Sequence, residues 1–398
     1  MLSPRRLYMD NAATSFPKPT VVLDAMARYA TELGASAGRG AYHEAVETAT
    51  LIATCRQRLN TLFNGENPDH FVFTLNCSGA LNMAIKGLID PRGDAADQHA
   101  IGTAIDHNSI LRPLKSLENA GCCEVTRLPV DAKTGLVDPD DLRRAIRPTT
   151  KLIAVTHASN VTGTVQPIRE IGQIAREHNI PFIVDAAQSA GHIPIDVQAD
   201  CIDLLAAPGH KALLGPLGTG LLYIRPGMES RLRTIQEGGT GSVSEEDTQP
   251  DFMPDKYEPG SHNAIGIAGL SEGVQWILNE GIETLKDHDL DLVRVFIDGA
   301  DSIEGLTYYG PQGVRHRLGV FSLRIEGLEP TELAMVLESE YGILTRPGLH
   351  CAPRIHEALG TTQYGGTTRF SFSPFLSKQD VKFATDALAE IAMSRVGV

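Results

Sequence analysis

Between residues 70 and 225, short segments that are apolar throughout alternate with segments of helical periodicity. Apolar segments of this kind are typical of parallel strands in a sheet that helices cover on both faces. Ligands bind at the carboxyl ends of the strands in such sheets, so functional side chains are expected directly after each segment. The expected strands include residues 71–73, 151–155, 181–184, 201–205 and 220–224.

The pattern changes at an acidic, proline-bearing stretch, residues 236–262, which we interpret as a long loop. The chain has 398 residues, which is enough for two domains, each with its own core. We predict an α/β fold with a large domain, residues 15–260, built on a mostly parallel seven-stranded sheet. A smaller αβ domain would comprise residues 1–14 and 261–398. Its expected elements are a helix at 265–285, strands at 320–325 and 367–372, and helices at 330–341 and 378–393.

Acidic side chains outnumber basic ones, and the net charge is −14. This chain lacks the basic surface that nucleic acids and anionic membranes require, which excludes both as general partners. No segment is apolar enough to span a bilayer, and no apolar run marks a signal peptide, so the cytoplasm is the expected compartment. The six cysteines are scattered without a Cys-x-x-Cys pair, and no metal site is expected.

Two charged residues follow expected strands. Lys211 comes shortly after residues 201–205, and alone it would more often be a solvated surface lysine. Asp185 follows residues 181–184 directly, and a buried carboxylate needs a partner because an isolated charge is costly away from water. A pyridinium nitrogen is one such partner, and capping of the next helix is the other interpretation.

Polar residues follow three further strands. Ser78 stands at a turn from strand to helix, where backbone N–H groups suit a phosphate, although an ordinary helix cap is the alternative. His107 could stack on a flat cofactor, or it could be a core or capping residue. Asn160 could donate to a ring hydroxyl or terminate a turn. Each of the five residues has an ordinary interpretation, but their convergence at one edge of a sheet favours a cofactor site.

Together these segments resemble the cysteine desulfurase branch of the class V, fold type I enzymes that depend on pyridoxal 5'-phosphate (PLP). The similarity extends from residues 10–14 (Asp-Asn-Ala-Ala-Thr) to Arg369. It implies a fold type I PLP-dependent transferase that acts on L-cysteine as a homodimer with shared active sites. Its most specific parts are residues 106–109, 157–164, 184–188, 209–211 and 346–353, the last reading Arg-Pro-Gly-Leu-His-Cys-Ala-Pro.

The resemblance also implies a role for each matching residue. Lys211 would carry PLP covalently and later move protons on the substrate, Asp185 would pair with the pyridine nitrogen, and His107 would stack on the ring and assist catalysis. The substrate would be bound by Ala13, Asn160 and the bidentate guanidinium of Arg369. The other cofactor contacts would come from Asn160 and Gln188 at the ring hydroxyl, from Cys77, Ser78 and His210 at the phosphate, and from Thr240 of the neighbouring subunit.

Cys351 is the residue that points to sulfur transfer. A thiolate must attack the substrate's sulfur, and thiolates form near positive charge or N–H dipoles. Arg346, His350 and His356 are close in sequence and could supply that setting, whereas the residue alone favours a buried, inert cysteine. The motif resembles the group with a short cysteine loop, whose members often need a separate sulfur-acceptor protein. The implied reaction converts cysteine to alanine, leaves a persulfide on Cys351 and serves iron–sulfur cluster biogenesis.

Some features depart from the family or leave alternatives open. Pro208 stands where many members carry Ser or Thr near the phosphate, and residues 77–79 (Cys-Ser-Gly) replace the more usual Ala-Thr-acidic sequence. A selenocysteine lyase, an epimerase or a transaminase could share Lys211 and Asp185, and a non-catalytic sulfur carrier or regulatory scaffold is a third hypothesis. The glycine-rich stretch 215–220 precedes a strand, whereas a dinucleotide-binding fingerprint follows one, which excludes a Rossmann dehydrogenase.

Overall fold

The larger part of the protein is organised around a seven-stranded sheet. The structure, a computed structural model, describes residues 6–38, 40–243 and 245–394. The strand order is β2-β8-β7-β6-β5-β3-β4, and β8 runs antiparallel to both of its neighbours while the other adjacent pairs are parallel. The predicted α/β class and mostly parallel sheet are thus confirmed. The strands are β2 (Phe71–Thr74), β3 (His99–Thr103), β4 (Glu124–Leu128), β5 (Thr150–Thr156), β6 (Phe182–Asp185), β7 (Leu204–Pro208) and β8 (Gly220–Ile224).

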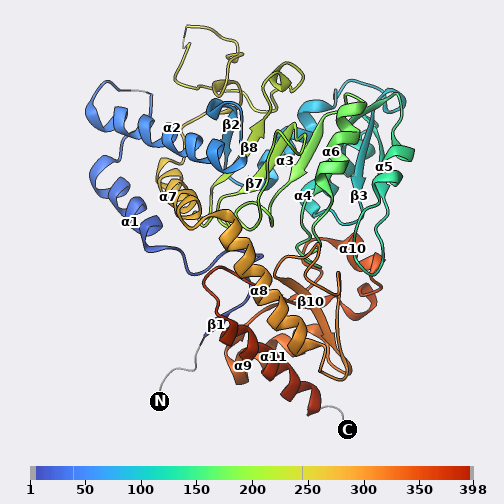
Figure 1. The fold of residues 1–398 in the computed structure, drawn as a ribbon. Helices are drawn as coiled ribbons and strands as arrows, with labels where there is room; N and C mark the ends of the chain where they lie inside the picture. The colour runs from blue at the N-terminus through green and yellow to red at the C-terminus, as the bar shows by residue number, and fades with distance from the viewer. Residues whose placement is uncertain (1–5, 39, 244, 395–398) are drawn as a thin grey trace.

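Helices cover both faces of this sheet, as the apolar strands require (Figure 1). One face packs against α3 (Cys77–Leu88) and α4 (Asn108–Asn119). The opposite face packs against α2 (His43–Phe63), α5 (Pro139–Ala145), α6 (Ile168–Glu177) and α7 (Ala264–Glu280). Helix α1 (Thr20–Arg28) lies against α7 at the periphery. Every residue of β6, β7 and β8 is buried, which explains why these segments are apolar throughout.

A smaller region with a separate core lies below the large sheet in Figure 1. Its four-stranded antiparallel sheet has the order β12-β13-β10-β9, and a parallel pair of short strands, β1 and β11, packs into the same core. The strands are β1 (Leu7–Tyr8), β9 (Leu306–Tyr308), β10 (Val320–Ile325), β11 (Ile343–Leu344), β12 (Arg346–Gly348) and β13 (Thr367–Ser371). The helices are α8 (Ile282–Ala300), α9 (Pro330–Tyr341), α10 (Pro353–Ala358) and α11 (Lys378–Met393).

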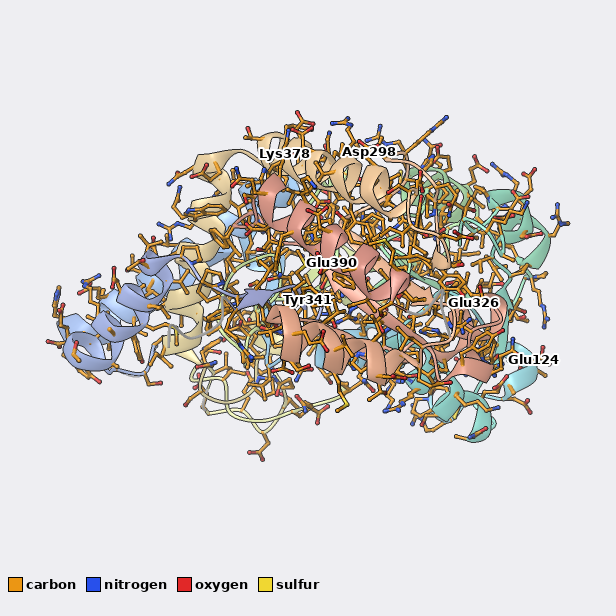
Figure 2. All side chains as sticks on the ribbon, turned by 90° about the horizontal axis from the view of Figure 1, so that it is seen from below. Glu124, Asp298, Glu326, Tyr341, Lys378 and Glu390 are labelled. Atoms are coloured by element: carbon orange, nitrogen blue, oxygen red, sulfur yellow. The ribbon has the colours of Figure 1, made fainter. Side chains whose placement is uncertain are left out.

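The outer face of the small region is formed by α8, α11 and α9, which lie side by side (Figure 2). Lys378 of α11 pairs with Asp291 of α8 at 2.8 Å, and Tyr341 of α9 donates a hydrogen bond to Glu390 of α11 at 3.0 Å. None of the helices in the described parts of the chain is long and apolar enough to cross a membrane.

The helix expected at 265–285 is wrong in its extent. The segment forms two helices, α7 and α8, which meet at Gly281. Gly281 has a φ of 83°, a conformation that costs glycine little and that turns the chain from the large sheet toward the small region. The domain boundaries at residues 14/15 and 260/261 stay a prediction.

Candidate active site

A cavity of about 180 Å³ lies at the carboxyl ends of β5, β6 and β7. The fold therefore places the candidate residues where the rule for parallel sheets locates a ligand. Eight of the residues expected from the sequence line this cavity together: Cys77, Ser78, His107, Asn160, Asp185, Gln188, His210 and Lys211.

Asp185 and Lys211 are the charged pair of the cavity. Asp185 is only 1% exposed, and burial raises the pKa of its carboxyl group, an effect that Lys211 and a hydrogen bond from the Ala187 N–H at 2.9 Å oppose. Burial also lowers the pKa of Lys211, against the influence of Asp185. A lysine with a lowered pKa holds more of its neutral amine, which is the nucleophilic form.

His107 caps α4 and faces the cavity at the same time. Its Nδ1 accepts a hydrogen bond from the Ser109 N–H at 3.1 Å, which leaves the proton of the neutral ring on Nε2. Burial and the nearby positive charges, with Lys211 first, lower the pKa of His107 to about 4, so the ring is neutral at pH 7. Ser109 Oγ also lies 2.7 Å from Ser78 Oγ, which connects the first turns of α3 and α4.

The amino end of α3 forms one side of the cavity. Asn76 caps the helix by accepting from the Gly79 N–H at 2.9 Å, and within the described chain the N–H groups of Cys77 and Ser78 have no backbone acceptor. Nδ1 of His210 is buried and likewise has no partner in the described residues. Free N–H groups at a helix start and an unpaired imidazole nitrogen are suited to a phosphate. Pro208 adds no hydroxyl group here.

Arg369, on β13, contacts the wall of this cavity from the small region but is not among the residues that line it. It is 1% exposed, and its Nη1 donates to the backbone oxygen of Asn160 at 3.1 Å. Its Nη2 lies 2.5 Å from Oδ1 of Asp10, while Nε is buried without a partner in the described residues. Asp10 belongs to a segment that resembles the family, but no local pattern indicates an ion pair between residues so far apart in the chain.

Cys351 lies between β12 and α10, and it is the most exposed of the six cysteines. Its backbone oxygen accepts a hydrogen bond from the Asn108 N–H at 2.8 Å, next to His107. Asn160 also donates to the backbone oxygen of His350 at 2.6 Å. Asn108 and Asn160 thus hold residues 349–352, between β12 and α10, which we call the cysteine loop. Nη2 of Arg346 lies 3.6 Å from Sγ of Cys351 and places a positive charge beside the sulfur.

The expectation that His350 and His356 add positive charge near Cys351 is wrong. Both side chains are buried, at 2% and 0% exposure, and their rings contact one another with centroids 5.5 Å apart. Burial lowers the pKa of His356 to about 4 and that of His350 well below its ordinary value. Both rings are therefore neutral at pH 7, and the positive charge in contact with the sulfur comes from Arg346.

The segment before α1 connects the small region to the backbone around Lys211. Gln188 donates to the backbone oxygen of Ala12 at 3.0 Å, and Ser15 donates to that of Lys211 at 2.8 Å. Lys18, which the sequence reasoning missed, donates to the backbone oxygen of His210 at 2.8 Å. Ala13 lies within this segment but outside the lining of the cavity around Lys211.

Thr240 is not brought to Lys211 within one chain. Its hydroxyl group lies 3.0 Å from Ser242 Oγ, beside a separate pocket of about 310 Å³ that Arg56 and His262 also line.

The family model described as aminotransferase class-V matches residues 7–383. The chain belongs to the aminotransferase class-V family. A probable cysteine desulfurase of Methanothermobacter thermautotrophicus is 34% identical over 97% of this chain and 94% of the relative. A cysteine desulfurase of Dictyoglomus turgidum is 31% identical over 97% of this chain and 94% of the relative. The predicted family and the prediction of an enzyme are therefore confirmed.

Solved structures agree with the assignment of the chain to this family. The apo structure of a cysteine desulfurase from Thermococcus onnurineus has a TM-score of 0.89 and 31% identity, and the match covers 98% of this chain and 95% of that one. A cysteine desulfurase of Escherichia coli has a TM-score of 0.86 and 27% identity, over 97% of this chain and 94% of that one. The predicted fold type I architecture is thus confirmed.

Proposed function

We propose that the protein is a PLP-dependent cysteine desulfurase that converts L-cysteine to L-alanine and leaves the sulfur as a persulfide on Cys351. The position of the cysteine loop carries this proposal. The Cys351 backbone is held by Asn108, beside the cavity that contains Lys211, and Arg346 lies next to the sulfur. A transaminase needs no thiol at this place, whereas sulfur transfer requires one.

The residues of the cavity fit PLP. When bound, PLP supplies an electron sink that weakens bonds at the carbon atoms of an attached amino acid. Lys211 would hold it covalently, Asp185 would pair with its ring nitrogen, and His107 would stack on the ring. The N–H groups at the start of α3 have no backbone acceptor in the part of the chain that the structure describes, and together with His210 they provide donors for the phosphate. The remaining contacts, at the ring hydroxyl and the phosphate, would come from Asn160, Gln188 and Ser78.

Arg369 would bind the substrate's carboxylate, with Ala13 and Asn160 beside it. Nε of Arg369 is buried and has no partner among the described residues, which supports this role because a buried donor without an acceptor is costly and a carboxylate would satisfy it. Lys211 is suited to moving a proton on the substrate because burial lowers its pKa.

Cys351 would then take the sulfur. Its Sγ forms a bond to the substrate's sulfur while the substrate's carbon–sulfur bond breaks, and the electron pair of that bond stays with the carbon. The carbon then gains a proton, which balances the one that the Cys351 thiol gave up to form the thiolate, and the product leaves as L-alanine. Arg346 stabilises negative charge on the attacking sulfur.

We also propose a homodimer in which Thr240 completes the phosphate site of the partner. A second cavity of about 450 Å³ opens beside Ser78, and Leu75 and Leu217 near it are 69% and 70% exposed. Exposed apolar side chains around a cavity support a protein partner at this face. The exposure of Cys351 supports transfer of the persulfide to a separate acceptor protein. A role in iron–sulfur cluster assembly and a place in the cytoplasm stay predictions.

Alanine release tests this proposal. The Cys351→Ala variant should lose alanine release from L-cysteine while it keeps the absorbance of bound PLP. The Cys201→Ala variant is the matched control, since Cys201 is the other cysteine that is not fully buried. Full activity of the Cys351 variant would refute the mechanism.

A further inference from the structure

The two carboxylate oxygens of Asp185 have different surroundings. Oδ1 accepts a hydrogen bond from the Ala187 N–H at 2.9 Å, and it also lies 3.5 Å from Sγ of Cys77. In the described part of the chain, Oδ2 receives no hydrogen bond. Because the side chain lines the cavity, an oxygen of Asp185 is left for a ligand.

The Cys77 thiol is restricted to the role of a donor. Cys77 is 8% exposed at the start of α3, and burial and Asp185 together raise its pKa well above the ordinary value. The thiol therefore keeps its proton, and an S–H group beside a carboxylate oxygen donates to it. The contact would be repulsive if both groups were ionised.

We propose that Cys77 is a positioning residue whose thiol, together with the Ala187 N–H, holds Oδ1 of Asp185 and turns Oδ2 toward the ring nitrogen of the cofactor. The inference rests on the proposed function for the identity of that cofactor. It gives the Cys77 side chain a different task from the phosphate contact that the family resemblance implies. The backbone N–H of Cys77 stays available to the phosphate.

A thiol differs from a hydroxyl group in this position. An O–H group donates a strong, short hydrogen bond to a carboxylate and stabilises its charge. The S–H group is a weaker donor, so it fixes the orientation of Asp185 and leaves more of its negative charge to the ring nitrogen. Cys77→Ser should therefore retain the orientation, and Cys77→Ala, which leaves the Ala187 N–H as the donor to Oδ1, should loosen it.

Infrared spectroscopy of the holoenzyme tests the contact itself. The S–H stretching band that disappears in Cys77→Ala belongs to Cys77. Cys123 provides the matched reference, since it is 1% exposed and its thiol has no hydrogen-bond partner in the described residues. The Cys77 band is expected at lower frequency and higher intensity than the Cys123 band. Coincident bands would overturn the proposal.

Cofactor affinity tests the consequence. We expect Cys77→Ala to weaken PLP binding about tenfold and Cys77→Ser to restore most of it. The second probe is the deaza analogue of PLP, in which carbon replaces the ring nitrogen. Its affinity should be the same for wild type and Cys77→Ala, because the analogue has no ring nitrogen for Asp185 to bind. Equal losses for both probes would assign Cys77 to the phosphate and overturn the proposal.

These outcomes are distinguishable from failure of the proposed function. A desulfurase assay without alanine release would refute the function but would leave the infrared band and the two affinities interpretable. The Cys123→Ala variant should bind both probes as the wild type does, and a loss of PLP affinity there as large as that of Cys77→Ala would overturn the specific role of Cys77.

Discussion

The ion pair between Asp10 and Arg369 allows a quantitative prediction about stability. The Arg369 side chain is 1% exposed, that of Asp10 is 20% exposed, and 2.5 Å separates Nη2 from Oδ1. Removing one partner of a buried ion pair costs about 3–5 kcal/mol, because the other charge stays buried. The partial exposure of Asp10 places the cost near the lower limit, and an asparagine amide still accepts a hydrogen bond worth about 1 kcal/mol. Asp10→Asn should therefore lower the free energy of unfolding by about 2 kcal/mol.

Calorimetry measures this effect. If the whole chain unfolds together, 2 kcal/mol corresponds to a fall in Tm of about 2–3 °C, and the fall is larger if the small region unfolds separately. Asp291→Asn is the matched control, because Asp291 forms exposed pairs with Lys378 and Arg294 at 2.8 and 2.6 Å. Water and salt screen exposed pairs, so the control should change Tm by clearly less than Asp10→Asn does. Equal Tm values for the two variants would refute the reasoning.

Two further predictions concern single cations. Arg346→Met removes the positive charge 3.6 Å from Sγ of Cys351. Single-turnover alanine release should therefore slow by about tenfold while PLP binding is retained. An unchanged rate would contradict the role assigned to Arg346. Burial lowers the pKa of Lys18 to about 8, whereas the pKa of a lysine in an unfolded chain is about 10.4. The folded protein holds fewer protons between these values, so the stability of wild type relative to Lys18→Met should rise from about pH 8 to about pH 10. A difference in Tm that is the same at pH 7 and pH 9.5 would count against this effect.

The sequence predicts the strand ends of the large sheet well because the strands themselves are buried. Strands β5 to β8 are covered on both faces, so their apolar segments are continuous and the polar residue after each one is conspicuous. Parallel topology then brings Asp185, Asn160 and Lys211 to one edge without any knowledge of the loops.

Other features depend on contacts that no local pattern encodes. Asp10 and Arg369 meet only because β1 and β13 pack in the same small region. In the sequence, His350 and His356 are candidates for supplying positive charge near Cys351, but burial in the fold lowers their pKa values and makes them neutral. The direction of the Cys77 thiol follows from the packing of α3 on the sheet, and its side chain meets Asp185 across 108 residues of chain.

The central claim is that Cys351 receives the sulfur of L-cysteine. The most direct measurement is anaerobic incubation of the holoenzyme with L-cysteine, followed by mass spectrometry of its cysteine-containing peptides. The account predicts one added sulfur atom on the peptide of Cys351, removable by a reductant, and none on the peptides of the buried Cys55 and Cys77. Release of alanine without added sulfur on Cys351 would contradict it.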